Sequence, residues 1–138
     1  MTYTRPVRIE FNHCDPAGIV FYPRYFEMMN HVVENFFRDV AGYPFERMVA
    51  AGNGVPTARV EVDFRAPSRL GQVLDWTLDA TRMGRSSVTF AVTATGGGVR
   101  RLTATLTVVW IGPDGRAAPW PDDIRARITP PEPTKEAP

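Results

Sequence analysis

The sequence predicts an α+β domain in which an antiparallel sheet of about five strands packs against one long helix. Two observations lead to this prediction. Residues 22–41 carry apolar side chains at spacings of three and four, which is typical of an amphipathic helix. Residues 55–111 alternate between apolar and polar side chains, which is typical of strands. A length of 138 residues fits a single domain, expected over residues 1–128.

The N-terminal part is expected to form a strand over residues 3–11, a turn, and the helix over residues 22–41. Residues 15–18, Asp-Pro-Ala-Gly, favour a turn because proline presets φ near −65° and glycine tolerates positive φ. Pro23 fits the first turn of a helix, where a missing N–H costs nothing. Gly42 and Pro44 end the helix. Its polar stripe consists of Arg24, Glu27, His31, Glu34 and Arg38.

A short helix is expected over residues 44–51, followed by four strands over residues 59–65, 74–81, 85–95 and 99–111. The intervening segments 67–71, 83–84 and 96–98 are short enough for an antiparallel meander, in which each strand pairs with the next. Residues 121–128 fit one or two helical turns. Residues 129–138 lack apolar side chains to bury, and we expect this Pro-rich tail to be disordered.

Charge and cysteine content exclude several classes of protein. The net charge is +1 and no basic arm is present, which argues against nucleic-acid binding. Seven arginines but four acidic residues lie from Arg59 to Arg101, which favours an anionic ligand. Cys14 is the only cysteine, so the sequence predicts neither disulfides nor a CxxC metal site. With no apolar run long enough to span a bilayer and no signal peptide, we expect a soluble cytoplasmic protein.

Residues 12–26 place an acid, a tight turn and a helix start in one stretch. The first four amides of a helix have no intrahelical partner and carry about half a positive charge in sum. They stabilise a carbonyl oxygen that becomes negative during a reaction. The stretch therefore favours acyl chemistry.

The stretch Cys14 to Tyr25, together with the order of elements, resembles the hotdog-fold acyl-CoA thioesterases, most closely the 4-hydroxybenzoyl-CoA thioesterase type. The resemblance covers residues 5–112, with supporting matches at residues 64–67 and 83–87. It implies a hotdog fold, in which the sheet wraps around the helix. It also implies hydrolysis of a small acyl- or aroyl-CoA, with no cofactor or metal because coenzyme A is part of the substrate.

The resemblance also implies roles for individual residues. Asp15 is the catalytic carboxylate, acting as nucleophile or as general base for water. The backbone N–H of Tyr22 holds the thioester oxygen, and Gly18 lets the backbone turn closely past the substrate. The acyl group lies in a pocket beside the helix and across a dimer interface. The candidate substrate-binding residues are His13, Phe21, Tyr25 and Met29, and the candidate CoA-phosphate ligands are Arg82, Arg85 and Ser86, with Arg100 and Arg101 less closely placed.

Several alternatives remain open from the sequence. Neighbouring residues of an extended strand point to opposite faces, which argues against a triad of His13, Cys14 and Asp15. Glu27 is the reserve catalytic acid, although it and His31 lie on the polar stripe of the helix. A non-hydrolytic module that binds acyl-CoA or an acyl carrier, and a hydratase, are the competing functions. The sheet edges favour a homo-oligomer, either a dimer or a tetramer built as a dimer of dimers.

Overall fold

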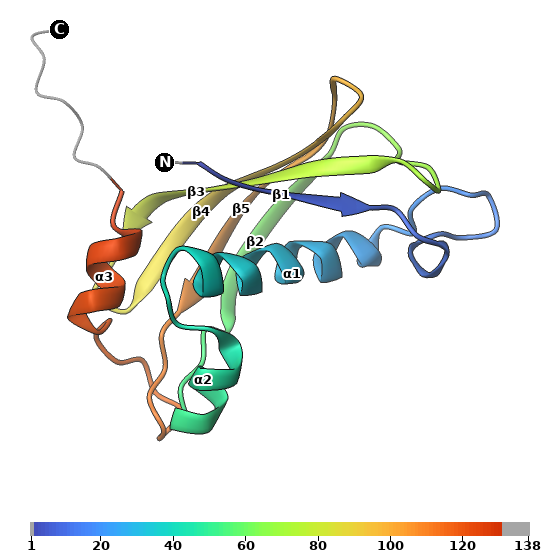
Figure 1. Cartoon of the computed structure of the whole chain (residues 1–138). Coiled ribbons are helices and arrows are strands. Elements are labelled where there is room, and N and C mark those ends of the chain that lie inside the picture. Colours follow the sequence, from blue (N-terminus) through green and yellow to red (C-terminus); the bar gives the residue numbers. More distant parts are fainter. Residues whose placement is uncertain (1, 131–138) are drawn as a thin grey trace, which may run out of the picture.

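The computed structural model describes residues 2–130 (Figure 1). Its elements are β1 (Tyr3–Arg8), the 3-10 helix η1 (Phe11–His13), α1 (Pro23–Asp39), α2 (Phe45–Ala51), β2 (Thr57–Phe64), β3 (Val73–Met83), β4 (Ser87–Gly96), β5 (Val99–Val109) and α3 (Asp122–Ile128). The α+β class and the five-stranded antiparallel sheet are confirmed. The first strand is shorter than expected, because η1 takes up residues 11–13. From residue 131, the tail expected to be disordered lies outside the described residues.

The strands are ordered β1-β3-β4-β5-β2, and every neighbouring pair is antiparallel. The expected meander is therefore wrong in one place: β2 pairs with β5 and not with β3. The segment 65–72 is short enough for a hairpin, but it instead runs past the ends of β5 and β4 to reach β3. We call this segment the crossover. The pairing of strands that are distant in sequence has no local sequence signal, so the sequence does not distinguish a β2–β3 hairpin from the observed β2–β5 pairing.

Arg101 holds the crossover against the sheet. It is 8% exposed and lies in β5 where the register with β4 shifts between Ala94 and Thr95. Its guanidinium donates hydrogen bonds to Pro67 O at 2.7 Å, Gln72 Oε1 at 2.9 Å and Gly96 O at 2.9 Å. Arg101, one of the less closely placed candidates for a CoA-phosphate ligand, therefore has a structural role in holding the crossover.

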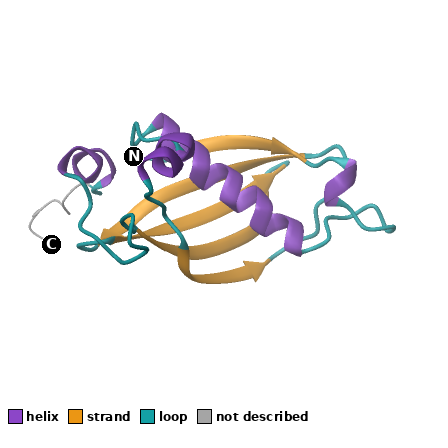
Figure 2. Ribbon diagram, turned by 90° about the horizontal axis from the view of Figure 1, so that it is seen from below, coloured by secondary structure: helices purple, strands orange, loops and turns teal. Residues whose placement is uncertain are grey.

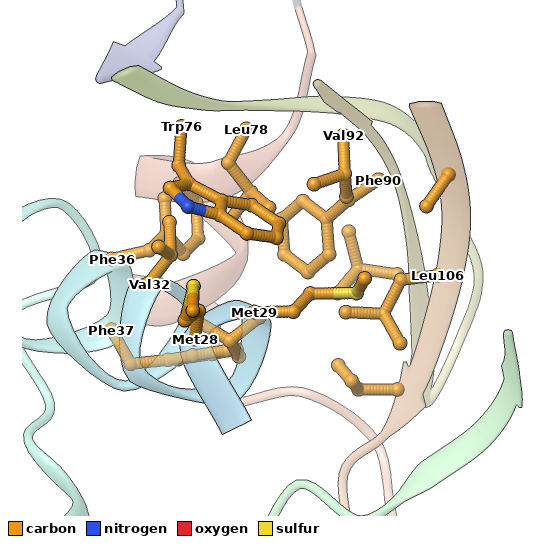
Figure 3. Close-up of a cluster of buried hydrophobic side chains, with 14 of the residues drawn as sticks. Met28, Met29, Val32, Phe36, Phe37, Trp76, Leu78, Phe90, Val92 and Leu106 are labelled. Atoms are coloured by element: carbon orange, nitrogen blue, oxygen red, sulfur yellow. The ribbon is translucent and has the colours of Figure 1, made fainter. Parts of the chain in front are cut away.

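The core lies between α1 and one face of the sheet (Figures 1 and 2). Figure 3 shows side chains of α1 meeting those of the strands, and the Phe36 and Phe90 rings lie 5.1 Å apart in an edge-to-face contact. Met28 and Val32 also belong to this buried face, whereas Phe26 on the same helix is 38% exposed. All five residues of the predicted polar stripe are exposed. Beside the core, the Tyr3 hydroxyl donates to Asp39 Oδ2 at 2.6 Å and ties β1 to α1.

Strand β2 forms one edge of the sheet and is exposed along nearly all its length. Val60 and Phe64 are 36% and 49% exposed, although both belong to the apolar side of the strand. An exposed edge with apolar side chains is prone to pair with another chain. Within residues 2–130, no helix has the length and apolar character needed to cross a membrane.

Replacing Arg101 with methionine is expected to lower the free energy of unfolding by about 3 kcal/mol, because buried acceptors at Pro67 and Gly96 lose their donor. Urea denaturation measures this change. Arg100→Met is the matched control, since Arg100 is exposed and its loss is expected to cost less than about 0.5 kcal/mol. Equal effects of the two substitutions would contradict the assigned role of Arg101.

Candidate functional site

Residues 13–21 form a closed loop between η1 and α1. Cys14 and Val20 form an antiparallel bridge, and the Phe21 amide donates to His13 O at 2.9 Å. The Asp15 amide donates to Ile19 O at 3.0 Å, and the Gly18 amide donates to Asp15 O at 2.9 Å. Gly18 has φ of 77°, a conformation that other residues adopt only with strain. The predicted turn is thus a rigid loop, which we call the Asp15 loop.

The crossover anchors this loop to the rest of the molecule. The Val20 amide donates to Ser68 O at 2.9 Å, and the Leu70 amide donates to Gly18 O at 3.2 Å. The hydroxyl of Ser68, a fully buried residue, accepts a hydrogen bond from Tyr25 Oη at 2.9 Å. Ser68 therefore connects the Asp15 loop, the crossover and the first turn of α1. Serine in a Pro-Ser-Arg connection carries no sequence signal for this role, and our sequence analysis missed it.

The carboxylate of Asp15 is held by its own turn. Oδ1 accepts a hydrogen bond from the Ala17 amide at 2.9 Å, and Asp15 is half-buried. No salt bridge joins this carboxylate to a basic side chain of residues 2–130. A carboxylate with a fixed orientation and an unoccupied second oxygen is suited to attack a carbonyl carbon or to accept a proton from water.

Tyr22 supplies a backbone donor beside this loop. It is the residue before α1, with φ of −53° and ψ of −34°, and Pro23 follows at the first helical position. The amides of Phe21 and Arg24 donate to backbone carbonyls, whereas the Tyr22 amide donates to no acceptor within residues 2–130. This N–H stands at the positive end of a helix of 17 residues. It is suited to stabilise an oxyanion.

Aromatic side chains surround the start of α1. Phe64, at the end of β2, has ring centroids of Tyr22, Tyr25 and Phe26 at 6.0, 5.8 and 6.5 Å. Phe21 packs edge-to-face on Tyr22 at 5.6 Å and is 48% exposed. The cluster gives the Tyr22 amide an apolar neighbourhood on the β2 side of α1. The alternation of β2 in the sequence indicates that Phe64 is inward-facing, but only the fold brings it to the helix start.

The predicted substrate-binding residues lie in different parts of the structure. His13 lines a polar cavity of about 470 Å³ on the β1 side of α1, together with Glu10, Glu27 and His31. Met29 lines an apolar cavity of about 220 Å³ on the β2 side, together with Phe26. Tyr25 is 4% exposed and packs against Trp76 in the core. The structure thus brings Phe21 near Tyr22 and Met29 to the cavity on the β2 side, whereas the His13 side chain lines the cavity on the β1 side.

The alternative catalytic residues have other contacts. Glu27 is exposed and accepts two hydrogen bonds from Arg24 Nη1, at 2.9 and 3.1 Å. His31 Nε2 accepts from Arg5 Nε at 3.1 Å, and His13 Nδ1 accepts from the Glu10 amide at 2.8 Å. Cys14 is half-buried, with Sγ 3.6 Å from Glu10 O. Within residues 2–130, no group of three or more His, Cys, Asp or Glu is arranged to hold a metal ion.

The candidate phosphate ligands lie at the end of β3 that is remote from the Asp15 loop. Arg82 lines a groove of about 540 Å³ on the outer face of the sheet, together with Arg59 and several threonines. Arg85 is exposed in the β3–β4 turn, and its backbone carbonyl accepts a hydrogen bond from the Trp120 amide at 3.1 Å. Ser86 O accepts from the Trp110 amide at 2.7 Å. Strand β3 has 11 residues, so about 33 Å separates its two ends.

Comparison with known proteins shows where similar sequences and structures occur. A family model described as the thioesterase-like superfamily matches residues 9–128. No curated protein matches the sequence. A 1,4-dihydroxy-2-naphthoyl-CoA thioesterase from Synechocystis superposes with a TM-score of 0.84 at 20% identity, covering 93% of this chain and 96% of that one.

Two further solved structures have the same fold. A gentisyl-coenzyme A thioesterase superposes with a TM-score of 0.83 at 22% identity, covering 89% of this chain and 99% of that one. A hypothetical protein from Staphylococcus aureus, solved in complex with CoA, superposes with a TM-score of 0.86 at 16% identity, covering 93% of this chain and 82% of that one. At these identities the likeness establishes the fold.

Proposed function

The chain belongs to the thioesterase-like superfamily, and on this premise we propose that it hydrolyses the thioester of a small acyl- or aroyl-coenzyme A. The observation that carries the proposal is the Tyr22 amide, which has no acceptor within residues 2–130 and follows the Asp15 loop at the helix start. Two structural neighbours act on aromatic CoA thioesters, gentisyl-CoA and 1,4-dihydroxy-2-naphthoyl-CoA, by their names. Aroyl thioesters such as 4-hydroxybenzoyl-CoA therefore belong in the first panel of substrates.

In the proposed reaction, Asp15 acts on the thioester while the Tyr22 N–H binds its carbonyl oxygen. As general base, Asp15 takes a proton from water, and the resulting hydroxide attacks the carbonyl carbon. As nucleophile, it attacks that carbon itself and forms an anhydride that water then hydrolyses. Along either route the C–S bond breaks, the CoA thiolate takes up a proton, and a carboxylate is released. The developing oxyanion is stabilised by the Tyr22 amide and the positive end of α1.

The remaining site residues are proposed around this centre. Phe21 and Met29 line the path of the acyl group on the β2 side of α1, and Gly18 keeps the loop close to the thioester. Tyr25 supports this path from the core. His13 supports it from the polar cavity on the β1 side of α1. The nucleotide phosphates of CoA are bound by Arg82, Arg85 and Ser86 of one subunit, and the thioester lies at Asp15 of a second subunit. Two subunits are needed because the length of β3 separates these three residues from Asp15 within one chain.

The proposed assembly is a homodimer, or a tetramer built as a dimer of dimers, in which copies pair along β2. Within residues 2–130 this strand has one partner, β5, and it exposes Val60 and Phe64. Pairing would satisfy its outer backbone groups and cover these side chains. The same contact would enclose the apolar side of the site.

Asp15→Asn is expected to lower kcat for acyl-CoA hydrolysis by at least about 100-fold, because the amide neither attacks the carbonyl nor accepts the proton. Product release is measured with a thiol reagent. Glu27→Gln is the control and is expected to keep kcat within about threefold, since Glu27 is engaged with Arg24. A fully active Asp15→Asn variant would refute the mechanism. Binding of acyl-CoA without turnover by the wild type would indicate a non-hydrolytic module.

The Tyr22 amide can be removed by Tyr22→Pro, because its φ of −53° is compatible with proline. Tyr22→Ala is the matched control, which removes the same side chain but retains the N–H. We expect kcat of the proline variant to be about 100-fold lower than that of the alanine variant. Circular dichroism checks that both fold. Equal kcat values in two folded variants would exclude the amide as oxyanion donor.

Val60→Lys is expected to convert the oligomer to monomers, because pairing along β2 would bring like charges from two chains together. Sedimentation velocity measures the assembly, and hydrolysis is expected to fall with it. Val99→Lys is the control, since Val99 is 48% exposed at the start of β5 and outside the edge. A monomeric wild type, or an unchanged oligomer in the Val60 variant, would contradict the assembly.

A further inference from the structure

An apolar groove extends along α1 well beyond the proposed reaction centre. Its first part is the cavity of about 220 Å³ between α1 and strands β2 and β5, lined by Phe26, Met29, Val33, Val60, Leu106 and Val108 among others. Its second part is a cavity of about 290 Å³ beneath α2, lined by Phe45, Met48 and Val49 among others. Asn30, Val55 and Thr57 line both cavities, so the two parts adjoin. We call them together the α1 groove.

Phe64 connects the side chain of Tyr22 to the first cavity of the α1 groove. The rings of Tyr22 and Phe26 both contact Phe64, at centroid distances of 6.0 and 6.5 Å, and Phe26 lines the first cavity. An apolar surface therefore runs from the proposed oxyanion donor into the groove. Most of the lining side chains are apolar, and the polar ones are Asn30 and Thr57 at the junction of the two cavities and Asn53 in the second cavity.

The length of this path selects among acyl groups. Phe26 lies four residues after Tyr22 and Asn30 eight, which places them about 6 and 12 Å along the helix axis. A benzoyl group with a para-hydroxyl extends about 6 Å from its carbonyl carbon, given bond lengths of about 1.5 Å. It would end at Phe26 and leave the rest of the groove empty. An extended chain advances about 1.2 Å per bond, so chains of about eight to ten carbons extend about 8 to 11 Å from the carbonyl carbon and end near the Asn30 junction.

We propose that the α1 groove binds a linear aliphatic acyl chain of about eight to ten carbons, and that such acyl-CoA thioesters are preferred over single-ring aroyl thioesters. This inference rests on the proposed thioesterase function and specifies its substrate class. The chain leaves the carbonyl at Tyr22, passes Phe26 and Phe64, and ends at the junction beneath α2. Apolar surface buried along this path supplies the selectivity, at about fourfold in kcat/KM per methylene.

The test compares hydrolysis of butanoyl-, octanoyl-, decanoyl- and benzoyl-CoA. We expect kcat/KM to rise by about 250-fold from butanoyl- to octanoyl-CoA, which differ by four methylenes, and to exceed the value for benzoyl-CoA. Asn30→Phe fills the junction from α1, and Thr57→Phe fills it from β2. Each is expected to lower the octanoyl-to-butanoyl ratio of kcat/KM at least tenfold. Glu34→Phe is the matched control on the same helix, because Glu34 is exposed and lines neither cavity.

Binding of the same thioesters to the Asp15→Asn variant, measured by calorimetry, separates the two proposals. Affinity that rises with chain length and falls with Asn30→Phe supports the groove, even if the wild type hydrolyses nothing and the thioesterase proposal fails. Hydrolysis that is fastest with benzoyl- or butanoyl-CoA, or a ratio unchanged in both junction variants, overturns the groove assignment and leaves the thioesterase proposal standing. Absence of both binding and hydrolysis overturns both.

Discussion

The candidate site depends on how the crossover of residues 65–72 is fixed to the sheet. Arg101 binds the crossover on the side of β5, through the carbonyl of Pro67 and the amide oxygen of Gln72. On its other side, Ser68 and Leu70 hydrogen-bond to the Asp15 loop. A buried guanidinium is costly to bring out of water, and its hydrogen bonds to carbonyl oxygens offset that cost. The same bonds give the loop a fixed platform outside the core.

The packing of α1 against the sheet sets the second part of the site. The apolar face of α1 is buried over most of its length, so its rotation and its direction on the sheet are fixed. This direction brings the first turn to Phe64 and to Ser68 of the crossover, as the contacts of Tyr22 and Tyr25 demonstrate. The packing of the core therefore fixes the position of the Tyr22 amide at the helix start.

The two solvent-facing sides of α1 differ in chemistry. The groove on the β1 side carries charged and imidazole side chains that are largely engaged with one another, such as Glu27 with Arg24 and His31 with Arg5. The groove on the β2 side is lined mostly by apolar side chains, and its wall residue Phe26 contacts Phe64, which also contacts Tyr22. The apolar surface beside α1 therefore lies on the β2 side, next to the edge strand of the sheet.

Local structure follows from the sequence: residue patterns predicted the three α-helices and the five strands to within a few residues, although not the 3-10 helix η1, and Asp-Pro-Ala-Gly followed by Pro23 predicted a turn and a helix start. These features depend on neighbouring residues. Only the tertiary structure decided that β2 pairs with β5, that Arg101 is buried, that Ser68 and Phe64 meet α1, and that Arg82 lies far from Asp15 in the same chain. Each of these contacts joins segments distant in sequence, where a short connection and an apolar pattern are compatible with more than one pairing.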